Sequence, residues 1–240
     1  MDSATPPAAG SVPKAQLQDI VEAVIKSRTA VRAFAPTPVP EGTLREILEI
    51  ARHAPSNSNT QPWFVHLLHG EPKRRFSQAV TRSHEEDALP PSAHFPDDLP
   101  APCKDRQADF GTRYYKVLGI DRDDLESRYR QTARNFCFFD APVGLIFSID
   151  KRLTKHSWLD FGLFLQTLML VAKSRGLDTC PQAAFAQYPV TIRRLLGLPA
   201  DEVVVCGMAI GYADQDAPEN ALRTSRVPAR EFATFAGFSD

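Results

Sequence analysis

Cysteine is scarce in this 240-residue chain and forms no paired motif. The four cysteines lie far apart, with no CxxC pair, which argues against a zinc site or a disulfide framework. The six histidines form no HExxH pattern, so we expect no metal site. Scattered cysteines of this kind are typical of a reducing compartment, and we therefore predict a cytoplasmic protein.

A strong net charge and a membrane-spanning segment are also missing. The formal net charge is -1, which gives no overall field that would recruit nucleic acid or an anionic membrane. The longest apolar run, residues 158–172, contains Asp160 and Gln166 and is shorter than the roughly 20 residues that span a bilayer. Its composition predicts a helix that is buried on most sides.

The N-terminus lacks the basic and apolar regions of a signal peptide. Residues 1–14 are rich in Pro and Ala, and we expect them to form a disordered tail. The remaining residues, 15–240, suffice for a single domain with a substantial core.

Apolar periodicity predicts an α+β fold. Helical spacing appears in residues 17–28, 40–54, 73–80, 106–119, 122–136, 157–176 and 188–197, whereas 63–70, 143–150 and 202–213 have strand patterns. Helices and strands do not alternate regularly, which argues against a doubly wound sheet. Residues 84–105 are acidic and rich in proline, and we expect an irregular segment there.

Well-known catalytic motifs are absent, but three polar or basic stretches stand out. The chain has no GxSxG elbow, GxGxxG fingerprint or P-loop. In "SRTAVRAF", Arg28 and Arg32 would share a helix face and could hold a phosphate, although, for this stretch taken alone, two solvated surface charges are the better explanation. "APSNSNTQPW" offers donors and acceptors for a planar heterocycle, although turn chemistry after Pro55 explains part of it. "CPQAAFAQYP" has small residues that let the backbone approach a ring, and "RTSR" adds two cations.

Taken in order, these stretches resemble the nitroreductase family of FMN-dependent oxidoreductases. The resemblance runs from about Leu17 to Phe238, and "PSxxNxQPW" with an upstream "RxxxR" is its most specific part. It implies an α+β sandwich in which helices flank a mainly antiparallel sheet. It also implies an intertwined homodimer with FMN at the subunit interface.

The resemblance assigns FMN-binding roles to residues of this chain. The phosphate and ribityl chain would meet Arg28, Thr29, Ala30 and Arg32, and Arg226, with Arg223 beside it, would complete the phosphate site. The other subunit would line the flavin with Pro55, Ser56, Asn57 and Asn59. Gln182, Ala183 and Ala184 would run beside the ring, with the Ala183 N–H near flavin N5.

Some features depart from the common family pattern. Many members have Ser where this chain has Ala30, and some have an acidic residue in place of Ala183, where only the backbone is needed. Residues 84–134 match a subset of members with a Pro-rich insertion, which we interpret as a lid. That subset resembles reductases of nitrobenzoate and similar nitroaromatics. We expect the substrate to contact the following aromatic cluster, although these residues could equally be core: Phe136, Phe138 and Phe139.

The implied reaction passes electrons from NADH or NADPH to a nitroaromatic by a ping-pong mechanism. The nitro group would be reduced through nitroso to hydroxylamine, and no catalytic side chain is predicted because the cofactor supplies the chemistry. Alternatives on the same fold are reductive dehalogenation and the reduction of a quinone or activated alkene. A non-enzymatic flavin-binding protein is a further alternative.

Overall fold

The computed structural model describes residues 12–87, 96 and 98–238. The predicted tail lies mostly outside these residues, and its last member, Lys14, is the first residue of helix α1, Lys14–Ser27. Within the described part of the chain, no helix is long and apolar enough to cross a membrane.

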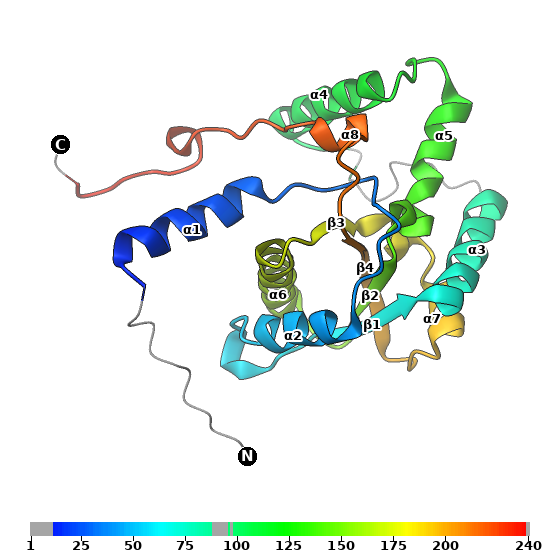
Figure 1. Cartoon of the computed structure of the whole chain (residues 1–240), viewed down its shortest axis with the longest axis horizontal. Coiled ribbons are helices and arrows are strands. Elements are labelled where there is room, and N and C mark those ends of the chain that lie inside the picture. Colours follow the sequence, from blue (N-terminus) through cyan, green and yellow to red (C-terminus); the bar gives the residue numbers. More distant parts are fainter. Residues whose placement is uncertain (1–11, 88–95, 97, 239–240) are drawn as a thin grey trace.

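A four-stranded antiparallel sheet forms the centre of the molecule (Figure 1). Its strands are β1, Phe64–His69; β2, Val143–Asp150; β3, Asp178–Gln182; and β4, Glu202–Gly211. They lie in the order β1-β2-β4-β3, so β1 and β3 are the edges. The predicted α+β class and antiparallel sheet are confirmed. Strand β3 was not predicted, because it is only five residues long and contains Pro181.

Helices cover both faces of this sheet, which explains why β2 is almost entirely apolar, with Ser148 as a buried polar exception. Phe147 and Leu145 of β2 pack with α2, Glu41–Ala51, and α6, Lys155–Ser174. Ile146 lies between these two residues in the sequence and points to the other face of the sheet. There it packs in a second apolar cluster with α3, Gly70–Asp87, and α7, Pro189–Leu196. Successive strand residues point to opposite faces, so a strand buried on both sides is apolar at most positions of both faces.

The insertion is more regular than its sequence predicts. Helix α3 continues to Asp87, and α4, Ala101–Val117, begins inside the segment that was expected to be irregular. Helix α5, Leu125–Ala133, follows. His84, at the start of the predicted loop, is buried, and its ring stacks on Tyr129 with 4.7 Å between the centroids. The expectation of an irregular segment is therefore wrong at both ends, while residues 88–95 and 97 lie outside the described part.

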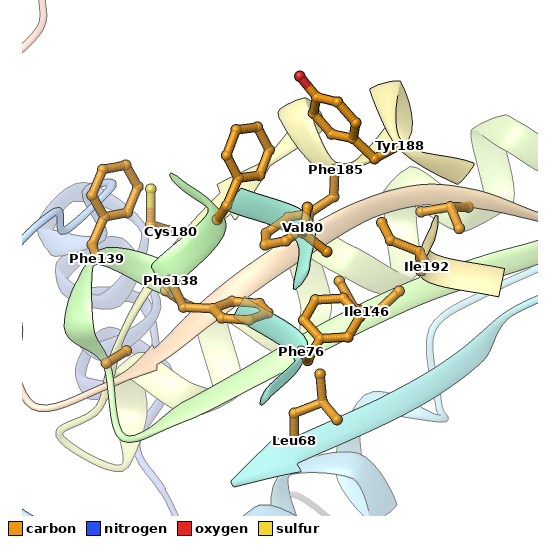
Figure 2. Close-up of a cluster of buried hydrophobic side chains, with 14 of the residues drawn as sticks. Leu68, Phe76, Val80, Phe138, Phe139, Ile146, Cys180, Phe185, Tyr188 and Ile192 are labelled. Atoms are coloured by element: carbon orange, nitrogen blue, oxygen red, sulfur yellow. The ribbon is translucent and has the colours of Figure 1, made fainter. Parts of the chain in front are cut away.

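The three phenylalanines proposed to contact substrate lie in the core, and Figure 2 labels two of them, Phe138 and Phe139. Phe136, Phe138 and Phe139 belong to the 3-10 segment Arg134–Asp140, and they are 0%, 0% and 3% exposed. The Phe138 ring stacks on Phe185 at 4.8 Å between centroids. In this chain their rings have no surface to offer a substrate. Their sequence pattern could not distinguish the two roles, since buried and ligand-binding aromatics look alike.

The turn that carries these rings is strained. Phe138, Phe139 and Asp140 have φ angles of 56°, 50° and 65°, a left-handed conformation that costs side chains with a Cβ roughly 1 kcal/mol or more each. Burial of the two rings offsets this cost, and Arg134 contacts the Asp140 carboxylate at 3.3 Å.

A small residue opposite the turn makes its burial possible. A Cβ placed on Gly144 would come within 2.6 Å of the Phe138 ring. We expect Gly144→Ala to lower the free energy of unfolding by about 1–3 kcal/mol, because the ring cannot move without disturbing the turn. Gly42→Ala in α2, where a Cβ meets nothing within 4 Å, is the control. Urea unfolding measures the free energy of unfolding of both variants. Equal stability of the two would contradict the idea that Gly144 makes room for the Phe138 ring.

Candidate cofactor site

Three arginines from two distant parts of the chain line a cavity of about 200 Å³. Arg28 and Arg32 come from the segment that follows α1, and Arg226 comes from the segment after the short helix α8, Pro218–Ala221. The remaining lining residues are Thr29, Ala30, Phe110, Leu222 and Thr224. The structure therefore brings together most of the residues predicted to hold a phosphate.

The backbone around Arg28 and Arg32 is extended, not helical. Helix α1 ends at Ser27, and Arg28 has φ -65° and ψ 122°. Ala30 then bridges to Thr179 of β3, and the Val31 N–H donates to the Thr179 carbonyl at 3.1 Å. The prediction of a shared helix face is therefore wrong. The two side chains meet in one cavity because the segment is anchored to the edge of the sheet.

Asn220 positions this segment against the C-terminal part of the chain. Its Oδ1 accepts from the Arg32 N–H at 2.9 Å, and its Nδ2 donates to the Ala33 carbonyl at 2.7 Å. Nδ2 also donates to the Asp214 carbonyl at 2.9 Å. A single amide thus holds the chain beside Arg32 and the chain leading to Arg226. This role could not be predicted from the sequence, because an isolated Asn has no motif.

The cavity carries positive charge without a carboxylate to balance it. Arg28, Arg32 and Arg226 make no ion pair within the described part of the chain. Burial lowers the pKa of Arg28, and the positive charge of Arg226 lowers it further. Like charges in a partly buried cavity repel one another, so this arrangement favours an anion between them. Arginine is well suited to a phosphate, whose oxygens accept its paired N–H groups.

Arg223 lies outside this cluster. Its Nη1 donates to the carbonyls of Asn220 and Leu222, at 2.7 and 3.3 Å, and it does not line the cavity. The cavity instead includes Thr224 and Phe110, which the sequence did not single out. Thr224 could have been noticed because it lies between the two arginines of "RTSR", whereas nothing marked Phe110.

The stretch predicted to run beside a ring begins at the end of β3. Gln182 is buried; its Nε2 donates to the Asn135 carbonyl at 2.6 Å, while its Oε1 has no hydrogen-bond partner among the described residues. A buried acceptor without a partner is costly, so this oxygen is suited to receive a ligand donor. Ala183 follows and is exposed, and Ala184 is partly buried against the core.

The polar stretch that follows α2 lies in a different part of the folded molecule. Pro55, Asn57 and Asn59 are exposed and do not line the arginine cavity, and Ser56 is half-buried. The Asn57 N–H donates to Asp160 of α6 at 3.1 Å. In Figure 1, α2 lies across α6 from α4 and α8, which flank the arginine cavity. One chain alone therefore does not unite the two predicted halves of the site.

The family model for nitroreductases, described as "Nitroreductase family", matches residues 25–212. The chain belongs to the nitroreductase family. It is 51% identical over 224 residues to a 4-nitrobenzoate reductase from Pseudomonas putida, covering 93% of this chain and 99% of that protein. It is 41% identical to a nitrobenzene nitroreductase from Ectopseudomonas oleovorans, over 90% of this chain and 96% of the relative.

Solved nitroreductase structures have the same fold. The FMN-dependent nitroreductase NfnB from Mycobacterium smegmatis, solved in complex with NADPH, superposes with a TM-score of 0.87 and 36% identity. The match covers 92% of this chain and 99% of that one. The insertion therefore belongs to a shared architecture, since the match extends over nearly all of both chains.

The charge of the arginine cavity predicts how this nitroreductase responds to anions. With FMN removed, adding sulfate or phosphate should raise the melting temperature of the wild-type protein by binding the folded state. Arg28→Gln should raise stability in buffer of low ionic strength, because it removes one of the repelling charges, and should reduce the gain from sulfate. Arg75→Gln, on the exposed surface of α3, is the control for general salt effects. An equal response of all three proteins to sulfate would contradict an anion site.

Proposed function

We propose that the protein is an FMN-dependent nitroreductase that uses NADH or NADPH to reduce nitroaromatic compounds. The observation that carries the proposal is the cavity of three arginines, which no carboxylate of the described residues pairs with and which suits the phosphate of FMN. The names of the relatives support the substrate class: one is a 4-nitrobenzoate reductase and another a nitrobenzene nitroreductase.

The chain's own residues would hold FMN at two places. Arg28, Arg32 and Arg226 would bind the phosphate, and the hydroxyls of Thr29 and Thr224 would add donors. Gln182, with an unpartnered buried Oε1, and the backbone of Ala183 would border the ring. FMN, when bound, supplies the two-electron chemistry that links the pyridine nucleotide to the acceptor.

The protein's contribution to the reaction is placement and charge. The short side chains of Ala183 and Ala184 leave room for a planar ring beside the backbone, and the cationic cavity favours negative charge nearby. Successive use of one pocket by the nucleotide and the acceptor gives ping-pong kinetics and needs no acid–base triad. The four cysteines are free, which suits the cytoplasmic location in this proposal.

A homodimer forms part of the proposal, because several apolar surfaces are exposed when only the described residues of one chain are considered. On α1, Leu17, Ile20 and Ile25 are 44%, 49% and 49% exposed. Helix α6, which packs beside α1, exposes Leu159 and Trp158, at 67% and 45%. The extended C-terminal arm adds three more exposed rings, at 71%, 70% and 80%: Phe232, Phe235 and Phe238.

These surfaces lie where a second copy would complete the site. Helix α6 carries Asp160, which holds the stretch after α2, and α1 leads directly to Arg28. A partner covering both helices could bring its own Pro55–Asn59 stretch to the arginine cavity of this chain. Obligate dimers bury large apolar interfaces of this kind.

Flavin binding and acceptor reduction test the enzymatic proposal. The purified protein should release FMN on denaturation, and NADH or NADPH should bleach its visible absorbance under anaerobic conditions. A nitroaromatic such as 4-nitrobenzoate should restore the colour. FAD, or no flavin even after reconstitution, would contradict the cofactor assignment. Colour that does not bleach with either nucleotide would favour a flavin-storing protein.

The phosphate assignment predicts the effect of single arginines. Arg226→Ala should weaken FMN binding about ten- to a hundredfold, because it removes charge-assisted hydrogen bonds. Excess FMN should restore activity. Arg223→Ala is a matched control, since that side chain lies outside the cavity. Quenching of flavin fluorescence on titration of the apoproteins measures the FMN affinity of both variants. Equal affinities of the two variants would mean that the phosphate binds elsewhere.

The dimer proposal predicts that a charge on α1 separates the subunits. Ile20→Glu should shift the molar mass measured by light scattering from dimer to monomer, since burying an unpaired carboxylate is costly. Val190→Glu on α7, at an equally apolar position that is 76% exposed, should remain a dimer. A wild-type monomer at micromolar concentration would overturn the proposal.

A further inference from the structure

The guanidinium of Arg32 lies against two aromatic rings of the insertion. Its Cζ atom is 5.1 Å from the centroid of the Phe110 ring and 5.1 Å from that of Tyr114. The two rings lie one turn apart on α4 and stack on each other, with 5.6 Å between centroids and 13° between planes. They form a nearly flat aromatic surface, to which the positive charge is attracted.

The aromatic surface is itself held in place. Tyr114 is 8% exposed, and its hydroxyl accepts from Gln131 Nε2 of α5 at 2.7 Å. On the same helix, Arg113 donates to the Arg223 carbonyl at 2.6 Å, which joins α4 to the segment leading to Arg226. Helix α4 therefore contacts both parts of the chain that supply the arginines of the cavity.

Arg32 would otherwise be free to point elsewhere. Its Nη1 makes one hydrogen bond, to the Ala30 carbonyl at 3.3 Å, and no ion pair with a described residue. An arginine side chain loses considerable rotamer entropy when a ligand fixes it. Rings that already hold the guanidinium reduce this loss at the moment of binding, so the site is preorganised for an anion.

We propose that Phe110 and Tyr114 are positioning residues for the flavin phosphate, which makes α4 of the insertion a part of the cofactor site. The rings hold Arg32 beside the phosphate, so the inserted helix affects cofactor affinity as well as covering the site. This inference rests on the proposed function, because it takes the anion to be the phosphate of FMN. By reciprocity, bound phosphate must also stabilise the docked position of α4.

The neighbouring tyrosine supplies a matched control. Tyr115 follows Tyr114 on α4 and contacts a different arginine, with the Arg128 Cζ 4.2 Å from its ring centroid. It does not line the arginine cavity. Replacing either tyrosine by leucine removes one cation–π contact from the same helix, but only Tyr114 contacts Arg32 directly. Tyr115 reaches Arg32 only through the Tyr114 ring, with 5.6 Å between their centroids. A third variant, Tyr114→Phe, keeps the ring and loses the hydrogen bond to Gln131.

The test compares FMN with riboflavin, which lacks the phosphate. We expect Tyr114→Leu and Phe110→Leu to raise the Kd of FMN about three- to thirtyfold, with little change for riboflavin. Tyr115→Leu should bind FMN like the wild type, and Tyr114→Phe should retain most of its affinity. A general loss of structure would instead weaken both ligands. Fluorescence titration of the full-length apoproteins measures all of these constants.

Hydrogen exchange of the wild type provides a second measurement that does not depend on the variants folding. Adding FMN should slow exchange in residues 101–117 more than adding riboflavin does. The inference is overturned if Tyr114→Leu and Tyr115→Leu have the same ratio of riboflavin to FMN Kd, or if the two ligands protect α4 equally. A wild type that binds neither flavin would instead contradict the proposed function, so the two failures can be told apart.

Discussion

The amide of Asn220 is the contact on which the candidate site depends. It accepts from the Arg32 N–H, 188 residues away in the sequence, and donates to the carbonyls of Ala33 and Asp214. Nearby, Glu219 is buried and pairs with Arg134 at 3.0 Å, so α8 is also tied to the turn that enters β2. These polar contacts bring Arg226 towards Arg28 against their mutual repulsion. The folded chain tolerates the repulsion between these arginines because contacts to the backbone, and not the arginine side chains, hold the segments together.

How far the sequence predicts this fold depends on how local the signal is. Strand β2 was predicted with its correct bounds, because an apolar run between turn residues is sufficient evidence. Helix α2 was predicted from Leu44, Ile47 and Ala51, which are its buried face. Strand β3 and the N-terminal turn of α4 were missed, since proline obscured both. Their structures depend on pairing with β4 and on contacts with α8, which are distant in the sequence.

Prediction of the candidate site is limited in the same way, because some of its residues have no local signal in the sequence. The arginines were recognisable by type and order, and the structure collects three of the four in one cavity, although by an extended segment and not by a helix face. Phe110 and Asn220 were not recognisable, because one supports an arginine and the other a backbone turn. Phe136 and Phe138 were recognisable as unusual but not as core, since only three-dimensional packing distinguishes these roles. Residues that act through another residue leave no motif in a single sequence.

Packing of Phe185 against the sheet positions the stretch that we propose borders the flavin ring. Gly207 of β4 has no side chain where the Phe185 ring lies, so the ring can rest directly on the strand. Phe185 belongs to the short segment Ala183–Gln187, so its burial determines where Ala183 and Ala184 lie. Gly144 admits Phe138 in the same way, and the turn around that ring presents the Asn135 carbonyl to Gln182. Two glycines in the sheet thus help to locate Gln182, Ala183 and Ala184, which we propose border the flavin ring. The chemistry of the site therefore depends on core residues that no ligand touches.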